Sequence, residues 1–410
     1  MNEFDDPPRA IPIARPVSAV PVVLPVSAID DEPPVRRKRR RFPEPSFRPF
    51  AAIGSAFEWL VGLAAVLVGL AVLAAIPIVQ FLSLGYLLEC SGRIARTGNV
   101  REGFIGIRLA ARLGGILFAS WLLLIPIRLA ADYAHSASII DPGGPIAQRW
   151  RIGLGFLIGL TAFHILTAIA NGGKFRHFVS PFNVIFVLRK LAAGGFYRQS
   201  RDAVWDTLIS LRLPYYFKLG FKGFIAAMAW LVVPVSLIAI SRATFTGSIF
   251  IGFVGGFLLA FVALYLPFLQ ARLGETGRLG AAFELRAVRQ RYRKAPWMFA
   301  FAFVSTVLFA LPLYLLKIEV VPREAAWLPS LVFIAFMVPS RLLVGWALAR
   351  ANRRDEPRHW FFRWTGRVPF LPVAAVYVVF VFFAQYTSWN GIWSLYEQHA
   401  FSLPVPFFGL

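Results

Sequence analysis

The chain has 410 residues, of which 58% are hydrophobic and only 16% are charged, and its formal net charge at pH 7 is +22. A soluble domain carries about 25% charged residues, so the composition argues against an ordinary soluble globular protein. A large positive charge raises the question of nucleic acid as a partner. Here the basic residues lie in short links between long apolar runs, which argues against nucleic acid and favours a membrane.

Residues 1–50 are rich in proline and end near the basic run Arg36–Arg41. Because closely spaced prolines block helix formation, we expect a disordered cytoplasmic tail, followed by a membrane domain over residues 51–410. A basic run before a membrane segment is typical of a topology signal that touches anionic head groups. The alternative is a docking site for an acidic partner or for nucleic acid. No apolar run precedes Phe50, so we expect no cleavable signal peptide.

Eight apolar segments follow the tail, and about 20 apolar residues suffice to cross a bilayer. The first segment has 32 residues and contains Pro77, so we expect it to be bent or re-entrant. The segments are 57–88, 113–131, 152–170, 221–240, 249–270, 297–316, 327–349 and 368–387. The sequence therefore predicts an all-α fold: a polytopic transmembrane helical bundle with interfacial amphipathic helices and a disordered N-terminal tail.

The links between these segments alternate between rich and poor in lysine and arginine. The rich links are 89–112, 171–222, 271–295 and 350–367, and together they hold 27 basic residues against five in the intervening links and the C-terminal segment. By the positive-inside rule, the rich links face the cytoplasm and the C-terminus lies outside the cell membrane.

This assignment conflicts with a cytoplasmic N-terminus if segment 57–88 crosses the membrane once. A re-entrant first segment removes the conflict, because both of its ends then lie on the cytoplasmic side. The alternatives are that the tail is translocated or that the first link defies the rule. We favour the cytoplasmic tail.

Several cytoplasmic links have the pattern of helices that lie in the head-group plane. In 280–294, apolar residues fall on one helical face and arginines on another. Similar apolar stripes occur in 201–213, where Pro214 is expected to end the helix, and in 182–191. An aromatic pattern predicts an outer-surface helix over 389–396. The candidate contacts for anionic lipid head groups are Arg286, Arg289, Arg291 and Arg293.

Polar groups inside the membrane are the usual functional candidates. The seven shorter segments contain no Asp or Glu. The candidates are His164, Arg128, Arg341 and, in the first segment, Gln80. His164 is read mainly as a hydrogen-bonded packing histidine, with a proton relay as the alternative. Arg128 and Arg341 lie near enough to span ends to reach the interface, with an anion contact as the alternative.

Recognisable catalytic chemistry is missing from the sequence. None of the five histidines pairs with another at metal-ligand spacing, and the one cysteine, Cys90, allows no cysteine-based metal cluster. Phosphate-binding, dinucleotide-binding and nucleophile-elbow motifs are absent. We therefore expect no metal, no cofactor and no enzymatic activity.

The first apolar segment ends in Gly85-Tyr86-Leu87-Leu88 and runs into an arginine-rich link. This arrangement, over residues 76–130, resembles bacterial multi-pass membrane proteins of unknown function, and the resemblance implies no activity. Residues 84–125 also resemble residues 266–311 in layout: a span, a link rich in Gly and Arg, and a span with proline near its far end. A structural repeat or convergence explains this equally well.

These observations favour a non-enzymatic membrane component that acts as a scaffold, an assembly factor or a lipid-interacting protein. Its expected partners are membrane lipids, with anionic head groups at the cytoplasmic face, and a protein that docks on the N-terminal tail. The alternative is a transporter or channel for a small or anionic solute, which the kinked spans favour. The absence of intramembrane carboxylates argues against ion-coupled transport.

Overall fold

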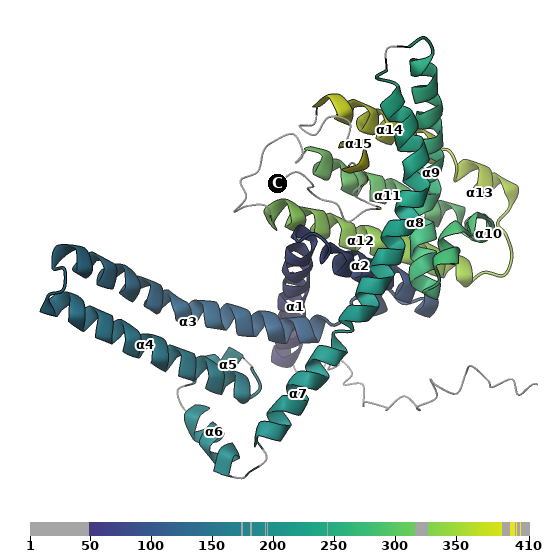
Figure 1. Ribbon diagram of the computed structural model, residues 1–410. Helices are drawn as coiled ribbons and strands as arrows, with labels where there is room; N and C mark the ends of the chain where they lie inside the picture. Colours follow the sequence, from purple (N-terminus) through teal and green to yellow (C-terminus); the bar gives the residue numbers. More distant parts are fainter. Residues whose placement is uncertain are drawn as a thin grey trace, which may run out of the picture. The chain divides into compact units, whose positions relative to one another are not determined.

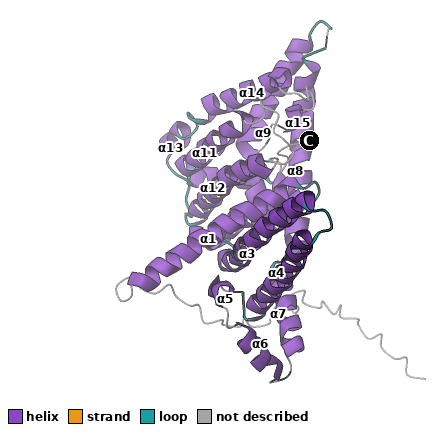
Figure 2. Cartoon of the chain, turned by 90° about the vertical axis from the view of Figure 1, so that its left-hand side faces the viewer, coloured by secondary structure: helices purple, strands orange, loops and turns teal. Residues whose placement is uncertain are grey.

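The computed structural model describes residues 49–173, 175–180, 183–192, 194, 196–243, 245–315, 327–387, 394–397, 399 and 402. All regular secondary structure in these residues is helical (Figure 2). The predicted fold class, a polytopic transmembrane helical bundle, is confirmed. The predicted tail up to residue 48, including Arg36–Arg41, lies outside the described residues, as does most of the predicted helix 389–396.

The first half of the chain forms α1 (Pro49–Ala75), α2 (Gln80–Thr97), η1 (Val100–Gly103), α3 (Ile107–Ile140), α4 (Pro145–Ala170), α5 (Phe175–Val179), α6 (Asn183–Ala192) and α7 (Phe196–Ser210). The second half forms α8 (Leu213–Ile240), α9 (Ser248–Thr276), η2 (Leu279–Phe283), α10 (Leu285–Lys294), α11 (Pro296–Leu315), α12 (Trp327–Asn352), α13 (Trp360–Thr365), α14 (Phe370–Thr387) and α15 (Ser394–Glu397). Figure 1 labels most of these helices.

Seven described stretches are long and apolar enough to cross a bilayer. An eighth span results if α10 and α11, which meet at an angle of 113°, are taken together. The seven shorter predicted segments each coincide with a helix: α3, α4, α8, α9, α11, α12 and α14. The longer first segment is divided between α1 and α2.

The break between α1 and α2 surrounds Pro77. Ile78 has φ of +69°, a left-handed conformation that is costly for a β-branched residue. The two helices turn back on each other: Ser83 Oγ donates a hydrogen bond to the carbonyl oxygen of Leu70 at 2.8 Å. Nearer the start of α1, the Trp59 ring packs edge-on against Phe104, which follows η1. The early turns of α1 therefore lie beside the link that leads out of α2.

Two predicted helix limits were wrong. Residues 280–294 do not form one helix, because Glu284 has a non-helical backbone (φ −80°, ψ 63°) and separates η2 from α10. Pro214 does not end α7. The chain turns at Arg212, whose φ is +49°, and Pro214 lies in the first turn of α8. Proline fits there because the first N–H groups of a helix have no intrahelical acceptor.

Helix α2 packs against α8, α9 and α12 (Figure 1). A Cβ added to Gly220 would lie 1.9 Å from the carbonyl oxygen of Phe81, and one added to Gly274 would lie 2.1 Å from that of Leu88. On α12, a Cβ at Gly345 would lie 2.5 Å from the backbone of Ser91. Glycine is needed at these crossings because the helix backbones are in direct contact.

The sequence similarity between the two links is matched by similar local geometry. Both α2 and α9 end in Thr-Gly, and Gly98 and Gly277 have φ of 73° and 70°. Each glycine N–H donates to the carbonyl four residues earlier at 2.7 Å, and a short 3₁₀ helix follows in both cases. The two parts then diverge, because η1 leads into the 34-residue α3 and η2 leads into the 10-residue α10.

Candidate functional site: the basic end of the bundle

Glu275 ties four helices together at the end of α9. Its carboxylate accepts hydrogen bonds from Arg291 of α10 at 2.6 and 3.1 Å and from Arg272 at 3.1 Å. The carboxylate also accepts a hydrogen bond of 3.3 Å from the side-chain amide of Asn352 on α12. The same amide nitrogen donates to the carbonyl oxygen of Ala95 in α2. Charged hydrogen bonds of this kind are strong when the groups are shielded from water. Glu275 therefore fixes α10 against the bundle.

Glu89, on α2, forms a second network at the same end. Its buried carboxylate accepts hydrogen bonds from Arg96 at 2.7 Å, from Arg93 at 3.3 Å and from the hydroxyl of Tyr215 at 2.7 Å. Arg96 also donates to the carbonyl oxygens of Gly274 and of the next residue, at 2.7 and 2.9 Å. These carbonyls belong to the last turn of α9, where a cation is favoured by the helix dipole.

Cations also meet the carbonyls of the two Thr-Gly turns. Lys222 donates to the carbonyl oxygen of Gly277 at 2.9 Å, and Arg353 donates to that of Gly98 at 2.5 Å. Carbonyls at helix ends lack intrahelical donors, so these contacts satisfy groups that the bundle would otherwise leave unpaired. Many of the basic residues at this end therefore hold the fold together.

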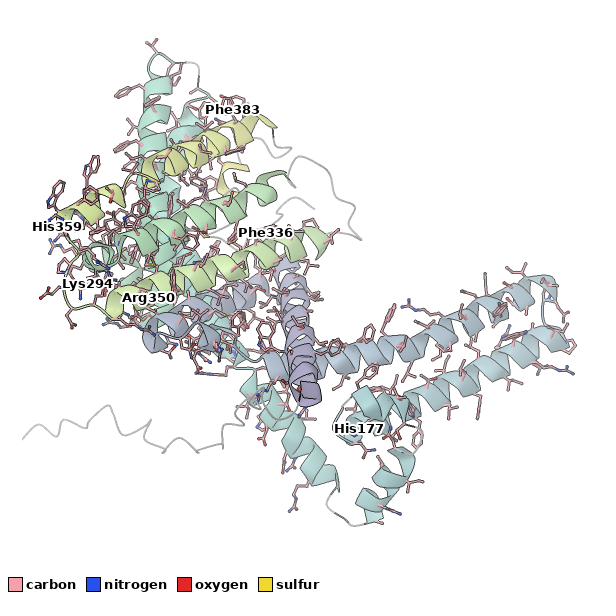
Figure 3. The ribbon with its side chains drawn as sticks, turned by 180° about the vertical axis from the view of Figure 1, so that it is seen from behind. His177, Lys294, Phe336, Arg350, His359 and Phe383 are labelled. Carbon is pink, nitrogen blue, oxygen red and sulfur yellow. The ribbon has the colours of Figure 1, made fainter. Side chains whose placement is uncertain are left out.

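The link between α12 and α13 covers the end of α10. The backbone N–H of Arg358 donates to the carbonyl oxygen of Arg293 at 2.8 Å, and Tyr292 donates through its hydroxyl to the carbonyl oxygen of Arg363 at 2.9 Å. Helix α13 exposes aromatic rings, as interfacial helices do. These rings are Trp360, Phe361, Phe362 and Trp364. Figure 3 shows Lys294, Arg350 and His359 at this end, with Phe336 and Phe383 away from it.

Three of the four predicted lipid contacts are available. Arg286, Arg289 and Arg293 are exposed, and their side chains make no ion pair or hydrogen bond with any residue that the structure describes. Arg291 differs from them, because both of its terminal nitrogens bind Glu275 and its side chain is only 18% exposed. Helical periodicity explains the difference: Arg291 lies two residues beyond Arg289, on the side of the buried Val288.

Among the intramembrane candidates, Arg341 is the most deeply buried. It lies on α12, and its Nη2 donates to the amide oxygen of Gln270 on α9 at 2.7 Å. Gln270 in turn donates to the carbonyl oxygen of Ser402 at 2.7 Å. The residue preceding Arg341, Ser340, donates a hydrogen bond to Thr306 of α11 at 2.9 Å. Arg341 therefore belongs to a packed polar contact between spans.

The structure does not gather the other candidates at this contact. His164, on α4, uses Nε2 to donate to the carbonyl oxygen of Phe178 in α5 at 2.8 Å, a bond that fits a packing role. Arg128, on α3, is exposed. Gln80 is buried at the start of α2. Within the described residues, no group of three or more His, Cys, Asp or Glu side chains is placed to hold a metal ion.

Glu89, Glu275 and Gln270 are not among the residues predicted from the sequence. A local signal was present for Glu89, because Glu89, Arg93 and Arg96 have the spacing i, i+4, i+7 of one helical face. The partners of Gln270 carried no such signal, because Arg341 lies 71 residues further along the chain. No protein-family model, curated protein or solved structure matches this chain.

Proposed function

We propose that this multi-pass membrane protein is a non-enzymatic, lipid-interacting component whose basic end binds anionic head groups. The observation that carries the proposal is the division of arginines at that end. Arg272 and Arg291 are held in ion pairs, whereas Arg286, Arg289 and Arg293 project from α10 without such partners among the described residues. A layer of anionic head groups attracts exposed arginines that have no carboxylate partner, and exposed aromatic rings such as those of α13 favour the same interface.

We place this basic end on the cytoplasmic side of the cell membrane, with the C-terminus outside. The alternation of basic links supports this orientation. The contact between Trp59 and Phe104 supports a cytoplasmic start for α1, because it brings the early turns of α1 beside one of the basic links. In this arrangement α1 enters the membrane from the cytoplasmic side and α2 leads the chain back to that side, which supports the re-entrant first segment.

The packing around α2 weighs against the transporter alternative. A solute path through the middle of a bundle needs space between helices. At Gly220, Gly274 and Gly345, the backbones of α8, α9 and α12 instead touch that of α2. This arrangement suits a rigid component that presents its ends to lipids or to other proteins.

The test is the lipid composition that the full chain retains from nanodiscs made of equal amounts of phosphatidylglycerol and phosphatidylcholine. We expect the wild-type protein to enrich phosphatidylglycerol at low salt and to lose the enrichment at 1 M salt, where charges are screened within about 3 Å. The triple variant R286Q/R289Q/R293Q should lose most of the enrichment, since each cation contributes about 1 kcal/mol near the surface.

A matched control, R128Q/R149Q/R151Q, removes the same charge from exposed positions on α3 and α4. It should leave the enrichment within twofold of wild type. Equal losses in the two triple variants would show that total charge, rather than this end of the bundle, sets the lipid preference.

A further inference from the structure

A groove of about 700 Å³ lies between α9, η2 and α10. This volume is within the range of about 300–1,000 Å³ that is usual for small-molecule sites. The lining residues are Phe261, Tyr265, Phe283, Glu284, Leu285, Arg286, Ala287, Arg289 and Gln290. The groove thus joins a membrane-spanning helix to the basic helix α10.

One wall of the groove is aromatic. Phe261 and Tyr265 pack against each other on α9, with ring centroids 4.9 Å apart. Phe283 stacks on Trp230 of α8 at 5.9 Å, and the Trp230 indole donates to the carbonyl oxygen of Ala282 at 3.0 Å. Phe261 and Phe283 remain exposed although their neighbours hold them in place. A firm, uncovered aromatic wall of this kind suits a hydrocarbon chain.

The opposite rim is cationic. Arg286 and Arg289 are exposed and make no side-chain ion pair with the described residues. Glu284 also lines the groove, but its carboxylate is held by Arg272 and lies 3.8 Å from Arg278. The charge left over at this rim is therefore positive, which favours an anion.

The two parts of the groove lie in the order that a membrane lipid requires. Tyr265 precedes the last residue of α9, Thr276, by eleven residues, or about 16 Å along the helix at 1.5 Å per residue. The aromatic wall therefore extends from the level of α10 toward the apolar middle of the span. A lipid with its head group at α10 would lay an acyl chain along Phe261 and Tyr265.

We propose that this groove holds one anionic phospholipid, with its phosphate between Arg286 and Arg289 and an acyl chain against Phe261 and Tyr265. The proposal rests on the proposed function and makes it specific, because it distinguishes a built site from a general basic surface. Charge complementarity selects the occupant: a zwitterionic lipid leaves the arginine pair without a net counter-charge, and a soluble anion leaves the aromatic wall uncovered.

The test counts phosphatidylglycerol molecules that remain bound to the full chain in native mass spectrometry after repeated delipidation. We expect wild type to retain one molecule. Retention should fall at least tenfold in R286Q/R289Q. The control R350Q/R358Q removes two exposed cations from the same end but outside the groove, and its retention should stay within twofold of wild type.

A second variant and its matched control test the aromatic wall. F261A should lower retention at least threefold, whereas F257A, one turn earlier on α9 and 75% exposed outside the groove, should not change it. Phosphatidylcholine should not replace the retained lipid, and glycerol phosphate in solution should not displace it. Phosphatidylglycerol with a photoreactive acyl chain should label the wild-type peptide containing Phe261 and Tyr265, a result that depends on no variant.

The outcomes separate the two proposals. If R286Q/R289Q and R350Q/R358Q lower retention equally, the basic end binds anionic lipid but the groove is not a site. Displacement by glycerol phosphate, or acyl labelling elsewhere on the chain, likewise overturns the groove proposal. If wild type itself shows no preference for phosphatidylglycerol, the proposed function fails as well.

Discussion

Replacing Glu275 by glutamine should destabilise the bundle far more than the same change at Glu284. Glu275 is 12% exposed and neutralises Arg291, which is 18% exposed and has no second ion-pair partner among the described residues. Removing one partner of a buried pair costs about 3–5 kcal/mol. Arg272 keeps Glu284 in this variant, so we expect the lower end of that range, about 3 kcal/mol.

Glu284 is the matched control because it is 36% exposed and its loss leaves Arg272 paired with Glu275. The E284Q variant should cost about 1 kcal/mol or less. The measurement is the unfolding free energy of the full chain in mixed micelles, titrated with SDS. In a double-mutant cycle, E275Q and R291M together should cost about 1–3 kcal/mol less than the sum of the two single variants. Equal costs for E275Q and E284Q, or strict additivity in the cycle, would refute this account of the basic end.

Two further predictions concern α2 and its neighbours. The variant G274A should destabilise the protein by about 1–3 kcal/mol despite the better helix propensity of alanine, because its Cβ would meet the backbone of Leu88. G155A on α4, where nothing lies within 4 Å, should be neutral or stabilising by up to about 1 kcal/mol in the same SDS titration. Burial raises the pKa of the Cys90 thiol to about 12. At pH 8 this thiol should therefore stay almost entirely protonated, whereas roughly a quarter of a free cysteine is thiolate. Iodoacetamide should therefore label Cys90 only after unfolding, and rapid labelling of the folded protein at pH 8 would contradict this.

The helices could be predicted because their signal is local. A run of about 20 apolar residues forms a helix in a bilayer, because a helix satisfies its backbone hydrogen bonds within the segment. Segments such as 221–240 and 327–349 therefore coincide with α8 and α12. The break before α10 carries no local signal, because Glu284 has a non-helical backbone although no proline or glycine stands there, and its partner Arg272 lies on α9. Pro214 was misread since proline fits both after a helix and in the first turn of the next one.

The candidate site could be predicted only in part, because charge pairing is a property of the folded bundle. Glu89 and Arg93 are one turn apart and could have been recognised from their spacing. Glu275 and Arg291 are 16 residues apart in different helices, and no periodicity joins them. The four arginines of α10 look equivalent as lipid contacts by charge alone, although the 3.6-residue repeat already places Arg291 with Val288 on the buried face.

The link 271–295 illustrates why the charge that orients a membrane protein differs from the charge that it presents to a ligand. All seven basic residues of this link count equally toward the positive-inside rule, since insertion precedes folding. Once α9 and α10 have packed, Arg272 and Arg291 are held against the carboxylates of Glu275 and Glu284, which largely cancel the fields of these two arginines. The net positive charge at the folded surface is therefore smaller than the sequence count. It is concentrated on the exposed side of α10, beside the groove, so lipid binding and topology should respond to different substitutions in the same link. Gln at Arg286 and Arg289 should lower lipid retention and leave the orientation of α9 in the membrane unchanged.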